Sequence, residues 1–166
     1  MRTVGGAERE DTHVNESRAD LALICRVHAR FCALPLAHVV EAMRPLPVEA
    51  VAGAPPFVRG LAVIRGVPVP VVDAAQLLGA QAAQADRFVT MTVGTRCVAL
   101  AVNSVLGVRT LPADLLQALP PLLQEAGADV VAAIALLDAE LLLVLNGSRL
   151  LSEDVWAALD TPGAAT

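Results

Sequence analysis

Few side chains in this sequence have the type and the spacing that catalysis requires. Metal sites need several converging ligands, and the short spacings that signal such sites do not occur between the histidines at positions 13, 28 and 38. A nucleophilic serine would be expected in a G-x-S-x-G turn, which is absent around Ser104, Ser148 and Ser152. The sequence also has no glycine-rich phosphate-binding motif. These residues predict a protein that is not an enzyme and holds no metal or cofactor.

The residues that suit molecular recognition lie at one expected turn and in one short apolar run. Arg65 and Gly66 separate two valine-rich stretches, and glycine accepts the positive φ that a tight turn needs. Arg65 is placed for recognition rather than catalysis, because no base, nucleophile or metal ligand accompanies it. Glu41 lies in an apolar run that begins at Val39, where a charge is costly unless it is exposed or paired. Val39 suits either core packing or a partner contact.

Two acidic residues and the cysteines have simpler interpretations. Asp138 and Glu140 flank an expected hairpin turn, where they are better interpreted as solvated turn residues than as a general acid and base.

The cysteines at positions 25, 32 and 97 are odd in number and lack C-x-x-C spacing. They predict buried thiols in a reducing cytoplasm, although a disulfide between the first two remains open.

Short strands joined by tight turns are expected to position these residues. Alternating, valine-rich stretches predict hairpins that join 21–27 to 31–36, 57–64 to 67–72, 87–93 to 96–102 with 106–111 as an extension, and 130–137 to 141–145. Short helical turns are expected at 113–119 and 121–126. Asp73 caps a short helix that Gly79 ends, and Ser152 caps a C-terminal helix. The pattern predicts a mostly β, barrel-like fold.

Composition narrows the classes of partner. The chain is 55% hydrophobic and 2% aromatic, with a mean hydropathy of +0.60, so its core must be built from aliphatic side chains. No uncharged apolar run approaches the roughly 18 residues that a membrane span needs. The net charge is −5 and every basic residue is arginine, with no basic cluster to attract nucleic acid. Residues 1–20 have few large apolar side chains and predict a mobile tail without a secretory signal.

The ordered motifs resemble the CheW-like family of chemotaxis adaptors. Its hallmark segment is matched at Gly60, Arg65, Gly66, Pro70, Asp73, Leu77, Leu78 and Gly79. An upstream motif is matched at Pro35, Val39 and Glu41, and the stretches 98–108 and 141–151 are similar to later family motifs. The sequence departs from the family at Asn103, where Asp is usual, at Val63, where Asn is usual, and at Ala132-Ala133, where glycine is usual.

The resemblance implies two small five-stranded β-barrel subdomains that share a hydrophobic core, with short helices that include a C-terminal one. The domain would span 21–160, with a pseudo-boundary near 80–86, possible strand exchange between the subdomains, and a tail at 161–166.

The resemblance also implies a cytoplasmic, non-enzymatic adaptor. Its expected partners are the regulatory domain of a CheA-type histidine kinase and the cytoplasmic tip of a chemoreceptor, and the partner-binding residues would be Val39, Glu41, Arg65 and Gly66. Direct membrane insertion is not expected. The alternatives are a scaffold in pilus or developmental signalling, or a small ligand-binding barrel or enzyme. An enzyme should show a polar pocket with converging titratable groups.

Overall fold

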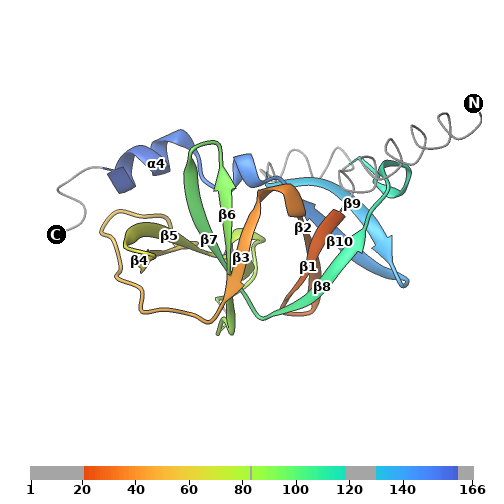
Figure 1. The fold of residues 1–166 in the computed structure, drawn as a ribbon, viewed down its shortest axis with the longest axis horizontal. Coiled ribbons are helices and arrows are strands. Elements are labelled where there is room, and N and C mark those ends of the chain that lie inside the picture. The colour runs from red at the N-terminus through yellow and green to blue at the C-terminus, as the bar shows by residue number, and fades with distance from the viewer. Residues whose placement is uncertain (1–20, 83, 119–129, 161–166) are drawn as a thin grey trace, which may run out of the picture.

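The computed structural model describes residues 21–82, 84–118 and 130–160. The tails expected at 1–20 and 161–166, and the helical turn expected at 121–126, lie outside these residues. Within the described ranges, ten strands form two five-stranded sheets that lie side by side (Figure 1). The prediction of a mostly β protein with two five-stranded units is confirmed.

The central sheet is built from one continuous stretch of chain. It contains β3 (Val39–Met43), β4 (Val58–Ile64), β5 (Val67–Asp73), β6 (Arg87–Val93) and β7 (Arg96–Val102), in the order β3-β6-β7-β5-β4. The terminal sheet combines the first two and the last three strands. It contains β1 (Leu21–Val27), β2 (Arg30–Pro35), β8 (Ser104–Thr110), β9 (Val131–Leu137) and β10 (Glu140–Leu145), in the order β8-β1-β2-β10-β9.

The two sheets follow one strand plan. In each, an edge strand pairs with a hairpin, and that hairpin pairs in parallel with a second hairpin. The parallel pairs are β5 with β7 in the central sheet and β10 with β2 in the terminal sheet. The edge strand of each sheet follows directly in sequence from the hairpin of the other, β3 after β2 and β8 after β7. The sheets have therefore exchanged their edge strands.

Neither sheet is a closed barrel, because the edge strands β3 and β4, or β8 and β9, do not pair along their length. Each open seam is narrowed by a single bridge from the segment that follows the edge strand. Glu49 exchanges backbone hydrogen bonds of 2.9 and 2.8 Å with Leu61, and Gln117 exchanges bonds of 2.8 and 3.0 Å with Ile134. The barrel expectation therefore holds for the strand number but not for closure.

The core lies mainly between the sheets. One buried cluster joins Leu23, Cys32 and Leu34 of the terminal sheet to Val72, Met91 and Leu100 of the central sheet, which confirms the shared core. The C-terminal helix α4 (Glu153–Asp160) adds Trp156 and Leu159 to this cluster. Arg96 holds the helix in place, because its guanidinium lies 4.8 Å from the Trp156 ring centre and 3.4 Å from the Glu153 carboxylate. Each sheet also has a smaller buried apolar cluster of its own.

Most expected hairpins occur within a residue or two of their predicted bounds, but the assignment of 106–111 was wrong. This segment does not extend the β6–β7 hairpin; it belongs to β8, which pairs with β1 in the other sheet. The expected pseudo-boundary near 80–86 falls after the short helix α2 (Ala74–Leu77) and before β6, between two strands of the same central sheet. The small, polar composition of 80–86 indicates a loop but carries no information on which sheet comes next.

Candidate functional site

An exposed ion pair joins two of the four predicted recognition residues. Arg65 donates from Nη2 to Glu41 Oε2 at 2.6 Å and from Nε to Oε1 at 3.3 Å. The Arg65 side chain is 75% exposed and that of Glu41 is 28% exposed. Because Glu41 lies on edge strand β3 and Arg65 lies in the hairpin turn beside the opposite edge strand, the pair spans the open seam of the central sheet.

The local backbone explains this geometry. Arg65 and Gly66 have φ angles of 53° and 79°, as a two-residue turn with two left-handed positions requires. A register shift between Val39 and Glu41 places Val40 outward at the edge, and the Thr90 hydroxyl donates to the Glu41 carbonyl at 3.3 Å. The twofold contact between guanidinium and carboxylate lowers the pKa of Glu41, chiefly through the hydrogen bond from Arg65. The same contact raises the pKa of Arg65.

The other two predicted residues have structural roles in the chain itself. Val39 is half-buried and packs against the shared core, and Gly66 supplies the left-handed turn position. A Cβ at Gly66 would meet no atom within 4 Å, so only backbone conformation requires glycine there. Their contact with a partner stays a prediction.

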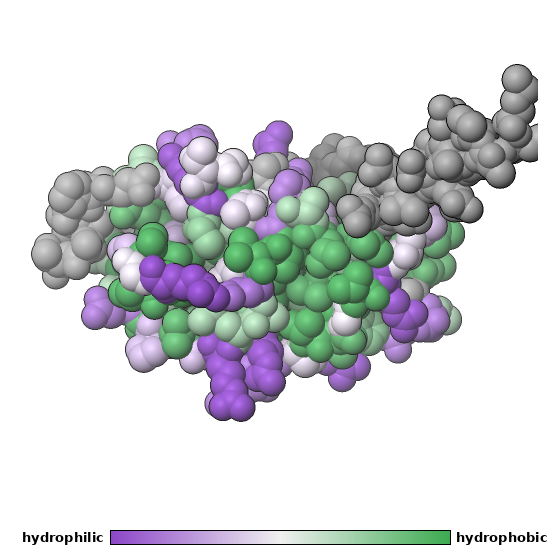
Figure 2. Space-filling view, viewed as in Figure 1, coloured by the Kyte–Doolittle hydropathy of each residue, from purple (hydrophilic) through white to green (hydrophobic). Residues whose placement is uncertain are grey.

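Exposed apolar surface lies beside the Glu41–Arg65 pair. On the face shown in Figure 2, hydrophobic residues cover the area where β3, β1 and β8 lie. The large apolar side chains that are exposed on these strands are Val40, Leu106 and Val108. Charged residues that fix register beside apolar anchors are typical of a protein-binding surface.

A further ion pair, within the hallmark segment, was not predicted from the sequence. Asp73 caps helix α2 as expected, because its Oδ1 accepts from the Gln76 backbone N–H at 3.2 Å. Its Oδ2 also accepts from Arg59 Nε and Nη2 at 3.0 and 2.8 Å. The Asp73 side chain is only 2% exposed, so this pair fixes the base of the hairpin that carries Arg65. The signal was the charged Arg59 within an apolar strand.

The departure at Asn103 also has a structural account. Asn103 accepts from the His28 backbone N–H at 2.8 Å and donates from its side-chain amide to the Gln84 carbonyl at 3.4 Å. An aspartate could not make the second bond, because an ionised carboxylate has no proton to donate. Asn103 therefore ties the turn between β1 and β2 to the loop before β6.

The thiols are poor candidates for chemistry. Cys25 and Cys32 face each other across the β1–β2 hairpin and are free, and burial raises the pKa of each to about 12. Burial also raises the pKa of the half-buried Cys97.

In the ranges that the structure describes, no three His, Cys, Asp or Glu side chains lie close enough to hold a metal ion. Within the same ranges, no helix has the length and apolarity to cross a membrane.

The chain is similar to known proteins in both sequence and fold. A family model described as the CheW-like domain matches residues 21–155. The chain is 25% identical over 116 residues to a chemotaxis protein CheW from Klebsiella aerogenes, covering 68% of this chain and 70% of that protein. Its fold is similar to the crystal structure of the scaffolding protein TtCheW from Thermoanaerobacter tengcongensis, with a TM-score of 0.71, 16% identity, and coverage of 82% of this chain and 95% of that one.

Proposed function

Because the chain belongs to the CheW-like family, we propose that it is a non-enzymatic adaptor that couples chemoreceptors to a CheA-type histidine kinase. Residues 21–160 form the adaptor domain. It acts in the cytoplasm and reaches membrane receptor arrays through its partners, which are the kinase regulatory domain and the receptor's cytoplasmic tip. Neither nucleic acid nor membrane insertion has a part in this function.

The observation that carries the proposal is the Glu41–Arg65 pair. Both residues match family motifs, and Arg65 is 75% exposed although it is bonded twice to Glu41. An exposed pair of this kind adds little to stability. It does present a fixed pattern of charge next to Val40, to which a partner surface can be complementary. Val39 and Gly66 contribute by holding the strand and the turn that carry the pair.

The test is co-sedimentation of folded variants with receptor-containing membranes and the kinase. Arg65→Glu and Glu41→Arg each place two like charges together and reverse one charge that faces a partner, so each should weaken assembly by about tenfold or more. The double variant Glu41→Arg/Arg65→Glu restores the internal ion pair but inverts its polarity toward the partner. Assembly by the double variant should therefore stay weak, while its circular dichroism spectrum and its stability match those of the unmodified protein. Arg149→Glu, at an exposed arginine elsewhere, is the matched control.

The outcomes separate the site from the function. If the double variant assembles normally, the pair has only an internal role and the site assignment is wrong. If the unmodified protein does not sediment together with the receptor and the kinase in one assembly, the proposed coupling function itself is wrong.

A further inference from the structure

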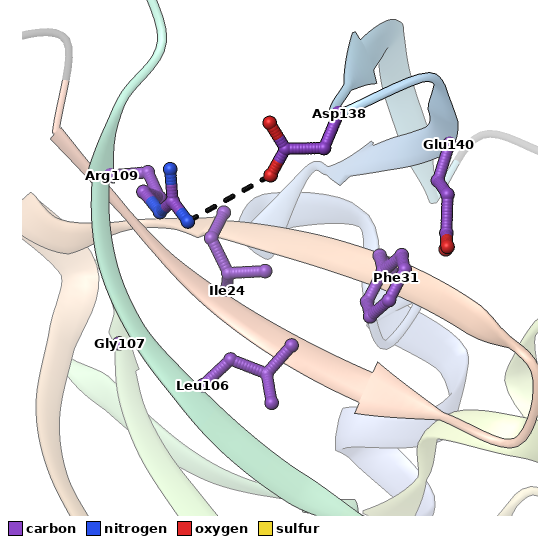
Figure 3. A pocket seen from close by; sticks show the side chains of 7 residues that line it. All are labelled: Ile24, Phe31, Leu106, Gly107, Arg109, Asp138 and Glu140. Atoms are coloured by element: carbon purple, nitrogen blue, oxygen red, sulfur yellow. Dashed lines mark ion pairs between the residues drawn. The ribbon is translucent and has the colours of Figure 1, made fainter.

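The terminal sheet has a pocket at the position where the central sheet holds its exposed ion pair. The pocket has a volume of about 170 Å³. Its lining comes from strands β1, β2 and β8 and from the β9–β10 hairpin, and consists of Ile24, Phe31, Leu106, Gly107, Arg109, Asp138 and Glu140 (Figure 3). Arg109 and Asp138 approach each other to 3.9 Å, and Ile24, Phe31 and Leu106 supply the apolar lining.

The registers of the two sheets identify this pocket as the counterpart of the Glu41 site. Val39 is paired with Met91 and Glu41 with Thr90, just as Val105 is paired with Cys25 and Gly107 with Ile24. The residue skipped by each register shift is exposed to a similar degree, Val40 at 56% and Leu106 at 55%. Gly107 therefore occupies the position of Glu41.

The facing hairpin turns correspond in the same way. Ile64 pairs with Val67 around the turn of Arg65 and Gly66, and Leu137 pairs with Glu140 around the turn of Asp138 and Ala139. Asp138 thus occupies the position of Arg65. In the terminal sheet the turn residue is an acid instead of a cation, and the position that corresponds to Glu41 has no side chain to meet it.

The absence of a side chain at Gly107 leaves unfilled volume beside Asp138. A Cβ at Gly107 would meet no atom within 4 Å. The volume of about 170 Å³ is smaller than the roughly 300–1,000 Å³ of sites for drug-sized ligands, and it suits a single side chain. The charge of the turn residue indicates what would fill this space: Glu41 meets Arg65 in one sheet, so a cation placed at the Gly107 position would meet Asp138 in the other.

We propose that this pocket binds an arginine side chain presented by a partner protein. The guanidinium lies beside Asp138 and Glu140, and the methylene stem covers the apolar lining. Arginine fits better than lysine because its planar group can bond two carboxylates and stack on an aromatic ring. The guanidinium carbon of Arg26 lies over the Phe31 ring, 5.3 Å from its centre, so an incoming guanidinium would contact the part of the ring that Arg26 leaves uncovered.

Arg109 is the internal competitor for this cation. It reaches Asp138 only at 3.9 Å, and the side chains of the two are 58% and 79% exposed, so the contact is weak. Its counterpart in the central sheet is Met43, because Arg109 pairs with Ala22 as Met43 pairs with Phe88. Removing the charge of Arg109 should therefore strengthen binding of the incoming arginine.

The experiment titrates the ¹⁵N-labelled full chain with N-acetyl-arginine methylamide and follows backbone amide shifts. Saturable shifts should centre on Gly107, Asp138 and Glu140. The variant Asp138→Asn/Glu140→Gln should weaken binding by about tenfold or more, because both carboxylate acceptors lose their negative charge. Asn suits the positive φ at position 138, so this variant should fold. Arg109→Met should tighten binding, and Asp154→Asn on α4 should leave it unchanged.

Two comparison ligands sharpen the test. The citrulline derivative has nearly the same shape without the charge and should not bind, and N-acetyl-glutamate methylamide tests for an anion site at Arg109. The proposal is wrong if the arginine derivative causes no saturable shift, if citrulline binds equally well, or if the double variant retains binding. It is equally wrong if the glutamate derivative binds instead and Arg109→Met abolishes that binding. Because the probe is one amino acid derivative, these outcomes do not depend on the proposed adaptor function.

Discussion

The central and terminal sheets share a strand plan but differ at their open seams. In the central sheet the seam is crossed by a twofold ion pair at 2.6 and 3.3 Å, and the base of the hairpin is fixed by Arg59 and the buried Asp73. In the terminal sheet Gly107 takes the position of Glu41, and the contact between Arg109 and Asp138 beside the pocket is 3.9 Å long. The same backbone plan therefore supports one seam that is crossed by a tight ion pair and one seam that contains a pocket.

The largest expected effect concerns a glycine beside the backbone bridge of the central sheet. Gly60 has a φ of 142°, and a Cβ there would lie 1.8 Å from the Glu49 carbonyl oxygen. Gly107 has a similar φ of 135°, but a Cβ there would meet nothing. Gly60→Ala should lower the free energy of unfolding by about 3 kcal/mol or more, and Gly107→Ala by about 1–2 kcal/mol from backbone strain alone. If urea unfolding gives equal losses of unfolding free energy for the two variants, the backbone bridge between Glu49 and Leu61 moves aside at little cost.

A smaller effect is expected from making the central hairpin resemble the terminal one. Asp73 corresponds to Asn146, since each donates its backbone N–H to the residue before the hairpin's first strand, Phe57 or Val130. Asp73→Asn keeps the side-chain oxygen that caps α2 but leaves Arg59 opposite a neutral amide. The free energy of unfolding should fall by about 2 kcal/mol, measured by urea unfolding with Asp154→Asn as control. A loss within error of the control would mean that the carboxylate charge does not anchor the hairpin.

The smallest effects are expected in the two hairpin turns, and they should have opposite signs. Ala139 has a φ of 66° and corresponds to Gly66, whose φ is 79°. Ala139→Gly should raise the free energy of unfolding, and Gly66→Ala should lower it, each by about 1 kcal/mol. Thermal unfolding of both variants tests the correspondence of the turns. A loss of stability on Ala139→Gly would show that the Ala139 methyl group makes contacts that outweigh backbone strain.

The sequence was most informative about local features. Tight turns and alternating apolar residues located the hairpins, including the β6–β7 pair at 87–93 and 96–102, because both signals depend on neighbours in sequence. The family resemblance supplied Glu41 and Arg65 separately, but not that they bond to each other across the seam. Asp73 was understood as a helix cap, which satisfies only one of its two oxygens.

Contacts between distant segments could not be predicted in this way. Strand β8 was assigned to the wrong neighbour, because a valine-rich edge strand fits either sheet equally well. Asp138 and Glu140 were read as solvated turn residues, and only the register of β8 against β1 places them beside Gly107 and a pocket. Such relations depend on register across long sequence separations, for which a single sequence carries no direct signal.

The exchange of edge strands has a consequence for synthesis on the ribosome. All strands of the central sheet lie between residues 39 and 102, so that sheet can assemble as soon as one continuous segment has emerged. The β1–β2 hairpin emerges earlier but finds its neighbours β8 and β10 only after residue 104. At about 5–20 residues per second, this leaves the apolar hairpin without its sheet for several seconds. The first two described strands are thus among the last to complete their sheet, and their apolar side chains are those that a chaperone would have to protect for longest.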